Sequence, residues 1–451
     1  MLPGTSVQVK RRCKLAAMRA RAIIGLGLVI AVACAAAAGC ARGSSSTDMN
    51  TLAERYVKLV LKVGQHDADF VDAYYGDPAW RPGADKTPLE TLTIEARSIR
   101  DALGAVPVDR GDEIVRLRRT YLEKQINAVE TRLAMLMGVK MSFDEEATRL
   151  YDATPPQTDA ADLQPALDEL ERLLPGPGTL VDRYATFRKR LEIPRERLDA
   201  VFRAAIQGCR ERTAAQLPLP RGESFTVEYV TGKSWSAYNW YKGNFTSLIQ
   251  VNTDLPVAID RALDLACHEG YPGHHVYNAL LEQHLVRDRG WIEFTVYPLF
   301  SPQSLIAEGT ANFGIEVAFP GVTRTAFERD TLFPLAGLDP ATADTYASVQ
   351  RATNKLSYAT NTAARRYLNG EIDRASASAW LQRYGMMAPD RADQRVRFID
   401  QYRSYVINYN LGQDLVRAYV DKRGGTEDHP DARWKVFGEL LRTPRVASGL
   451  R

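Results

Sequence analysis

Metal-binding and disulfide-forming side chains are scarce in this sequence. Its 451 residues include only five cysteines and six histidines. No two cysteines form a C-x-x-C pair, so a zinc site built from thiolates is excluded on ligand count. Only Cys209 and Cys267 lie beyond the first 40 residues. We expect them to be two separate buried thiols, with a single disulfide as the alternative.

Acidic side chains are absent from the first 39 residues, which carry six basic ones. When these six are set aside, the formal net charge changes from +3 to −3 for the remaining 412 residues. A weakly acidic body offers no broad electrostatic field to nucleic acid, so we predict no nucleic-acid partner. The 45% share of hydrophobic residues also excludes a disordered chain.

The longest apolar run, over residues 22–38, is too short and too rich in alanine for a confident membrane span. It leads into AAGC, and small residues directly before Cys40 resemble a bacterial lipobox, whose cysteine is lipidated. The alternative is an ordinary secretory signal that is cleaved nearby. We predict a signal peptide over 1–39, followed by the lipidated cysteine and a tether over 40–50. The protein would be lipid-anchored in the bacterial cell envelope, with the periplasmic face of the outer membrane favoured.

The body of the chain is predicted to be mainly α-helical with a small sheet in its middle. Apolar residues recur at helical spacing in five segments before residue 220 and again from residue 257 onward; the five segments are 51–75, 89–103, 116–136, 159–174 and 195–217. Two prolines then close an N-terminal helical lobe over 51–220, and a second lobe follows over 221–451. The β-branched and aromatic runs 224–230 and 247–252 predict strands. The second of them is either an edge strand that binds substrate or a plain structural strand.

Three of the six histidines fall within the eight residues HEGYPGHH, which begin at His268. Imidazole is the commonest metal ligand in proteins, and zinc peptidases place a glutamate base beside such a histidine, here Glu269. Two ligands on a straight helix are four residues apart. His274 and His275 are six and seven residues away, which is about 9 and 10.5 Å along an ideal helix. A kink and a widened turn at the Pro-Gly pair would correct the spacing, and we favour His274 as the ligand.

The third ligand must come from elsewhere in the chain. Glu308 stands in the helical pattern AEGTANFGIE, 40 residues beyond His268. Two histidines and one glutamate leave the fourth position of a zinc ion open for water, which is the arrangement of a catalytic site. His275 would then contact either a ligand or the substrate.

HEGYPGHH, EGTANFGIE and YVINYNLG together resemble the bacterial domain-of-unknown-function family 885, whose motifs read HEAYPGHHLQ, EGWALYxE and QALSYKIG. The resemblance covers most of the chain and implies a zinc metallopeptidase with a helical fold cleft in two. It implies a zinc ion held by His268, Glu308 and one of the two later histidines, with Glu269 as the base. Thr310 and Asn410 depart from the motifs, and these departures affect substrate preference more than the metal site.

Tyr409 matches the tyrosine of the third motif. It could donate a hydrogen bond to a developing oxyanion, or it could be a core tyrosine. The sequence thus predicts a zinc-dependent hydrolase that cleaves peptides. The alternatives are a non-catalytic envelope lipoprotein that binds metal or peptide, and a structural scaffold. Glu269 favours the enzyme, because a binding site needs no free carboxylate beside its ligands.

The lipobox makes the first testable prediction. Mass spectrometry of the N-terminus from the native bacterial host should show an acylated Cys40 as the first residue, because lipidation and cleavage occur at the same position. An unmodified N-terminus upstream of Cys40 would contradict it.

Overall fold

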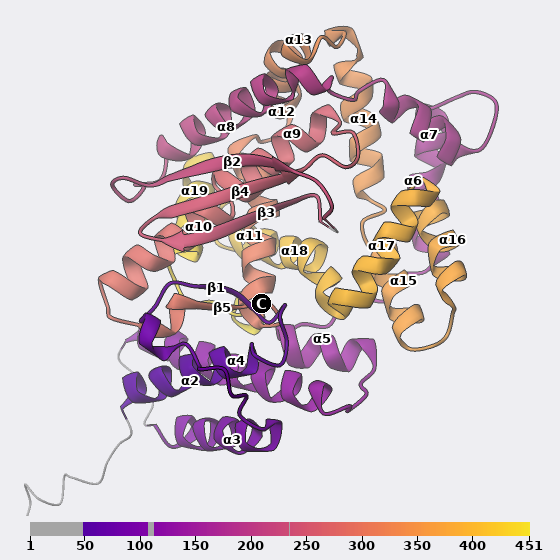
Figure 1. Cartoon of the computed structure of the whole chain (residues 1–451). Helices are drawn as coiled ribbons and strands as arrows, with labels where there is room; N and C mark the ends of the chain where they lie inside the picture. The colour runs from indigo at the N-terminus through magenta and orange to yellow at the C-terminus, as the bar shows by residue number, and fades with distance from the viewer. Residues whose placement is uncertain (1–47, 107–111, 234) are drawn as a thin grey trace, which may run out of the picture. The chain divides into compact units, whose positions relative to one another are not determined.

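A computed structural model describes residues 48–106, 112–233 and 235–451; the predicted signal peptide, Cys40 and most of the tether lie outside them. Met49–Arg451 is one compact unit. The α-helices are α2 (Met49–Val63), α3 (Leu89–Ala105), α4 (Glu113–Leu136), α5 (Phe143–Tyr151), α6 (Ala160–Leu173), α7 (Leu180–Lys189), α8 (Leu198–Ala214), α9 (Ile259–Leu265), α10 (His274–Leu281), α11 (Pro302–Ala318), α12 (Val322–Phe327), α13 (Phe333–Ala336), α14 (Ala343–Asn354), α15 (Ala359–Leu368), α16 (Arg374–Tyr384), α17 (Pro389–Tyr402), α18 (Ile407–Lys422) and α19 (Pro430–Leu441). The predicted mainly α fold is confirmed (Figure 1). None of the helices in the described ranges is long and apolar enough to cross a membrane.

Short 3-10 and π-helical turns link these helices. The 3-10 turns are η1 (Pro78–Trp80), η2 (Arg195–Arg197), η5 (Ile292–Thr295), η7 (Pro340–Thr342), η8 (Arg403–Val406) and η9 (Ala447–Leu450). The π-helical turns are η3 (Ala266–Gly270), η4 (Glu282–Arg287) and η6 (Glu328–Leu332). The first of the π-helical turns contains the start of the histidine motif.

Two small sheets accompany the helices. The strands are β1 (Val71–Tyr74), β2 (Ser224–Val230), β3 (Ala237–Gly243), β4 (Thr246–Asn252) and β5 (Val296–Pro298). β4 lies between β2, to which it is parallel, and β3, to which it is antiparallel, whereas β1 pairs with β5. Both predicted strands are confirmed. Because β4 is central, the interpretation of 247–252 as an edge strand is wrong, and the alternative, a plain structural strand, is confirmed. The edge strand β3, an aromatic segment, was not predicted.

The helical pattern predicted over 51–75 ends early. α2 stops at Val63, and β1 begins eight residues later. β1 pairs with a strand more than 200 residues away, and helical periodicity carries no information about such a partner. This strand is important for the candidate site, because its residue Asp72 lines the cavity described below.

One hydrophobic core runs from Leu52 to Leu450 and includes side chains from both sides of residue 220. Helices before that residue pack directly on later ones, for example α4 and α5 on α11. The change from helices to sheet does occur at 220, as expected. The division into two lobes at this position stays a prediction.

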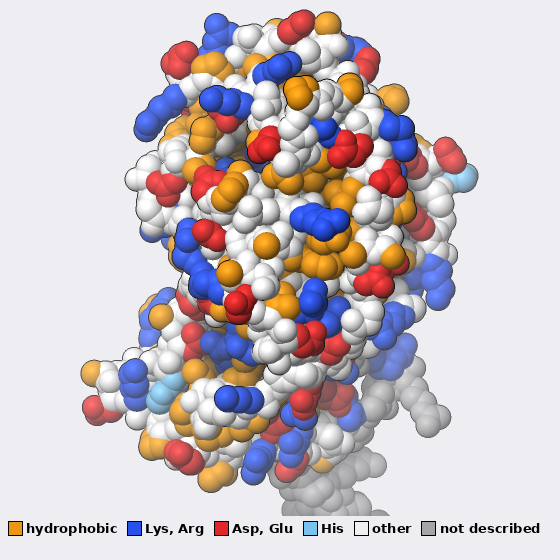
Figure 2. Space-filling model, turned by 90° about the vertical axis from the view of Figure 1, so that its right-hand side faces the viewer, with side chains coloured by type: hydrophobic (Ala, Val, Ile, Leu, Met, Phe, Trp, Pro, Cys, Tyr) orange, Lys and Arg blue, Asp and Glu red, His pale blue; other side chains and the backbone are white. Residues whose placement is uncertain are grey.

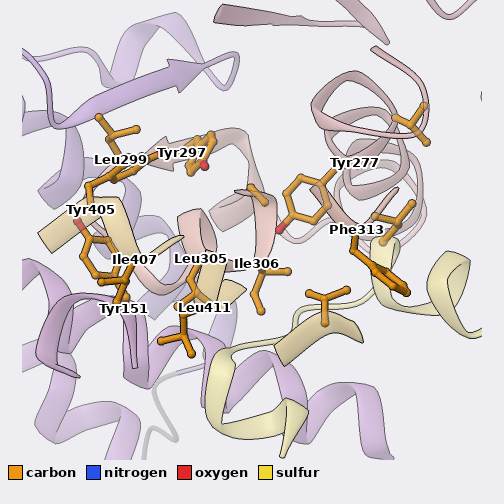
Figure 3. Packing of buried hydrophobic residues seen from close by; sticks show 14 of the residues in the cluster. Tyr151, Tyr277, Tyr297, Leu299, Leu305, Ile306, Phe313, Tyr405, Ile407 and Leu411 are labelled. Atoms are coloured by element: carbon orange, nitrogen blue, oxygen red, sulfur yellow. The ribbon is translucent and has the colours of Figure 1, made fainter. Parts of the chain in front are cut away.

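The most extensive packing between two elements of this core is between α11 and α18. Figure 3 shows Leu305 and Ile306 of α11 beside Leu411 of α18, with Tyr405 at the edge of the cluster. The backbones touch where Gly309 faces Gly412. A Cβ on Gly309 would lie 2.4 Å from the carbonyl carbon and oxygen of Gly412, closer than real atoms approach.

Cys209 and Cys267 form a disulfide, with a Cα–Cα distance of 5.6 Å. Our expectation of two separate thiols is therefore wrong. The two cysteines are 58 residues apart on α8 and η3, and the packing of these two elements brings their side chains together. Sequence spacing alone cannot reveal that contact.

The glycine contact gives the second testable prediction. Gly309→Ala should lower the free energy of unfolding by about 1–3 kcal/mol or more, because the added methyl group meets backbone that cannot rotate away. Chemical denaturation measures this change. The control is Gly104→Ala, where the added Cβ meets nothing within 4 Å and helix propensity favours alanine by about 1 kcal/mol. Equal stability changes in both variants would contradict the proposed close contact.

Candidate metal centre

The first three residues of the histidine motif lie in a π-helical turn, because the regular helix α9 ends at Leu265. η3 continues α9 as a widened turn, and the chain becomes extended at Tyr271, whose peptide bond to Pro272 is cis. Gly273 then returns against η3, where a Cβ would lie 1.8 Å from the carbonyl oxygen of His268. α10 begins at the next residue, His274. A kink and a widened turn in this stretch were predicted from the Pro-Gly pair, and the structure has both.

The break brings His268 and His274 together. Their ring centroids are 4.6 Å apart, and the ring planes are nearly perpendicular at 88°. One ligand atom from each histidine and one from Glu269 all lie within 4.8 Å of one another. Three side chains from one motif thus converge at the distance that a shared metal ion requires.

Glu308 of α11 faces the same two histidines. Its Oε2 lies 3.2 Å from Nε2 of His268, and its Oε1 lies 3.7 Å from Nε2 of His274. The carboxylate is buried, and Oε2 accepts no well-directed hydrogen bond from the described residues. A buried carboxylate oxygen without a hydrogen bond is costly, and a cation would compensate it. The set of two imidazoles and one carboxylate therefore fits a zinc ion.

A second layer of hydrogen bonds holds the donors. Nδ2 of Asn312 donates to the carbonyl of Tyr409 at 2.8 Å, so its Oδ1 faces Nδ1 of His268 at 2.9 Å and accepts from it. This bond keeps a proton on Nδ1, so Nε2 is the atom that would bind a metal ion after losing its own proton. Tyr405 donates from its hydroxyl to Oε1 of Glu308 at 2.8 Å and fixes that carboxylate as well.

The acidic groups of the site share an excess of negative charge. Burial raises the pKa of Glu269 to about 7, with His268 opposing and Glu308 adding to the shift. Burial, followed by the charges of Glu308 and Glu269, raises the pKa of Asp72 to about 8. Such shifts mark a place where several carboxyl groups compete to be charged, and a bound cation would relieve that competition.

The two histidines respond differently to the same surroundings. Burial works against the charged form of His268, but Glu308 and Glu269 outweigh it and raise its pKa to about 9. Burial lowers the pKa of His274 to about 4. The charge of Glu308 opposes this shift, and the charge of His268 adds to it. Of the pair, His274 is therefore already neutral, which is the form that binds a metal.

His275 points to the other side of α10. It is fully buried, with Nε2 3.0 Å from Glu223 and Nδ1 2.9 Å from Ser247 of β4. The hydroxyl of Tyr271 and the guanidinium of Arg210 also bond to Glu223. The structure does not bring His275 to the cluster, and its catalytic role stays a prediction. Its contacts connect the histidine loop to the sheet.

Tyr409 borders the cluster from α18. It lines the same cavity as the two histidines, and burial together with the charge of Glu308 raises the pKa of its hydroxyl well above the ordinary value. Its ring also packs against Phe398 and Tyr405. Both predicted interpretations, an oxyanion donor and a core tyrosine, are compatible with this position.

Sequence reasoning missed three residues of the site, namely Asp72, Asn312 and Tyr405. Asn312 and Tyr405 stand inside motifs that were singled out, each four residues from a predicted site residue, so helical spacing could have indicated them. Asp72 gave no signal, because it lies almost 200 residues before the histidine motif in an ordinary sequence context.

The cluster opens into a cavity of about 1560 Å³. Its walls include residues of β1, α7, β3, α9, α11, α14, α17 and α18, so most of the chain contributes to it. The outer face in Figure 2 mixes basic, acidic and hydrophobic side chains and shows no continuous field of one sign. The volume exceeds what a single small metabolite needs and leaves room for several residues of a peptide.

The choice between the two adjacent histidines gives the third testable prediction. His274→Ala should lose most of the bound zinc, because it removes a donor that faces His268 and Glu308. His275→Ala should keep stoichiometric zinc but unfold at a lower temperature, because it leaves buried Glu223 without one of its partners. Metal analysis and thermal unfolding of both variants measure this. Retained zinc in the first variant together with lost zinc in the second would reverse the assignment.

No family model matches this chain, and no curated protein matches it. Solved structures with similar backbones include a "putative lipoprotein" from Colwellia psychrerythraea, with 15% identity, a TM-score of 0.48, and coverage of 82% of this chain and 70% of that one. A "putative lipoprotein of unknown function" from Shewanella oneidensis has 13% identity, a TM-score of 0.43, and coverage of 78% and 72%. A structure described as BsuCP has 11% identity, a TM-score of 0.42, and coverage of 88% and 90%. All three TM-scores are below 0.5, so these likenesses support no functional argument.

Proposed function

We propose that this protein is a zinc-dependent peptidase of the bacterial cell envelope, anchored there by a lipid on Cys40. The observation that carries the proposal is the presence of a second carboxylate beside a complete set of ligands. His268, His274 and Glu308 supply three donors, and Glu269 remains within 4.8 Å of the histidine donors. A site that only stores or binds a metal has no use for that extra group.

His268, His274 and Glu308 would hold the zinc ion, which in such sites lowers the pKa of a bound water and polarises the scissile carbonyl. Asn312 and Tyr405 orient two of these ligands through the hydrogen bonds described above. In hydrolysis, the water oxygen bonds to the carbonyl carbon while the C–N bond of the peptide breaks.

Glu269 would manage the protons of this reaction. It takes one from the attacking water and returns one to the departing amine, so that the products are a carboxylate and a free amino group. Tyr409 borders the same space and would donate a hydrogen bond to the oxygen that becomes negative. Its buried hydroxyl stays protonated at neutral pH, because its pKa is raised, and it therefore remains a donor.

The substrate would reach these groups along the cavity wall. β3 is an edge of its sheet, and its residues Ala237, Tyr238 and Asn239 line the cavity. Edge strands bind extended peptides through backbone hydrogen bonds that tolerate different side chains. The edge strand β3, rather than the central strand β4, is therefore the candidate surface for substrate.

The test of this function is the fourth prediction. Glu269→Gln should keep zinc but reduce hydrolysis of a mixed peptide library by about 10²- to 10⁴-fold, because the amide cannot accept the proton. Chelation of the wild type should stop hydrolysis, and added zinc should restore it. Zinc analysis and product analysis by mass spectrometry measure both effects.

The matched control is Glu439→Gln, an exposed glutamate on α19 that should leave activity unchanged. Full zinc content with no hydrolysis of any library by the wild type would contradict the peptidase. That result would favour the alternative, a non-catalytic lipoprotein that binds metal or peptide.

A further inference from the structure

Two arginines of the cavity lack an ion pair among the residues that the structure describes. Arg391 and Arg395 stand four residues apart on α17, so they share one face of that helix, and both line the cavity that contains His268 and Glu269. Within the described ranges, neither forms an ion pair with a carboxylate. The guanidinium of Arg391 contacts Oε1 of Gln394 at 3.5 Å, and that of Arg395 lies 5.2 Å from the ring of Phe398.

Other arginines of the same cavity differ in this respect. The shortest guanidinium–carboxylate distance is 2.8 Å for Arg188 with Asp260, 2.9 Å for Arg324 with Asp264, and 2.6 Å for Arg417 with Glu316; these pairs hold the walls together. These pairs contrast with the two arginines on α17 and with Arg351 of α14, for which no ion pair occurs among the described residues. On α17, two such side chains stand together on one face of the helix.

A third arginine increases the positive charge at this place. Arg261 of α9 lines the cavity seven residues before His268, and its closest acidic group is Asp264 at 3.7 Å. Burial lowers the pKa of Arg395. Tyr409 raises this pKa in part, and the charge of Arg261 lowers it further. Burial also lowers the pKa of Arg391, where the charges of Arg261, Arg188 and Arg395 oppose Asp390. All three guanidinium groups line the same cavity, where their positive charges disfavour one another.

The charged groups also connect this place to the candidate metal centre. The charge of Arg395 acts on the hydroxyl of Tyr409, and the charge of Arg261 acts on Glu269. The cationic cluster of Arg261, Arg391 and Arg395 therefore lines the same cavity as the groups that would carry out hydrolysis. A ligand held by this cluster would be positioned next to the scissile bond.

We propose that Arg391 and Arg395, supported by Arg261, bind a carboxylate of the substrate residue that follows the cleaved bond. Guanidinium groups bind carboxylates through paired hydrogen bonds, and an anion would relieve the repulsion among the three guanidinium groups, of which Arg391 and Arg395 are half-buried and Arg261 is partly exposed. The free C-terminus of a peptide supplies such a carboxylate, and so does a glutamate or aspartate side chain. With the C-terminus as the ligand, hydrolysis releases one amino acid at a time. This inference rests on the proposed peptidase.

The test measures binding rather than turnover. Zinc-loaded Glu269→Gln protein is titrated by calorimetry with N-acetyl-Ala-Leu, with its C-terminal amide, and with N-acetyl-Ala-Glu amide. We expect the free acid to bind at least about tenfold more tightly than the neutral amide, because charge-assisted hydrogen bonds are lost in the amide. Tight binding of the glutamate amide as well would show that the cluster also binds a side-chain carboxylate.

Adding Arg395→Met should bring the ratio of acid to amide affinity close to one, and Arg391→Met should reduce it. Arg395→Lys should keep part of it, because a lysine retains the charge but not the planar fork. The matched control is Arg397→Met, an exposed position on the same helix, which should leave the ratio unchanged. Circular dichroism and zinc content show that each variant is folded.

Equal affinity for all three peptides, or an unchanged ratio in Arg395→Met, would overturn the carboxylate site. The binding measurement distinguishes failure of this site from failure of the proposed function. A preference for carboxylates in a protein that hydrolyses no peptide would support this site and contradict the peptidase. Hydrolysis of peptides by a protein with no such preference would do the opposite.

Discussion

The candidate site depends on the close approach of two helices, α11 and α18, at Gly309 and Gly412. Glu308 precedes the first glycine and Tyr409 stands three residues before the second, so the contact fixes the distance between them. Asn312, one turn further along α11, joins the helices by a hydrogen bond to the carbonyl of Tyr409 and also orients His268. Any larger residue at the contact would separate the helices and displace a carboxylate from the histidines.

The sequence predicted the parts of the site that are determined locally. A proline and a glycine between His268 and the next histidines indicated that the helix must break, and the structure has a widened turn followed by an extended residue. Helical spacing likewise placed Glu308 on a helix. Each of these inferences needs only the preferences of a few neighbouring residues, which the backbone obeys wherever the segment lies in the fold.

The parts that depend on distant contacts were not predictable. Asp72, the strand that carries it, and the disulfide from Cys209 to Cys267 all depend on segments that meet only after the chain has packed. The central place of β4 has the same origin, because it depends on pairing with β3, a strand that was not predicted. A single sequence shows the local preference of each segment for helix or strand. These features depend instead on which distant segments pack or pair with one another.

The cavity separates its charges in a way that suits a peptide end. Carboxylates gather around His268 and His274, where a dication would balance them, and unpaired guanidinium groups gather on α17, where an anion would. Among the described residues, His268 and Arg261 offset only part of the negative charge at the first place, and no carboxylate forms an ion pair with Arg391 or Arg395 at the second. A zinc ion at the first place and a substrate carboxylate at the second would together make the cavity electrostatically complete, whereas each alone would leave buried charge unpaired. Metal and substrate are therefore expected to depend on neighbouring but separate groups of this chain, which is why their binding can be measured independently.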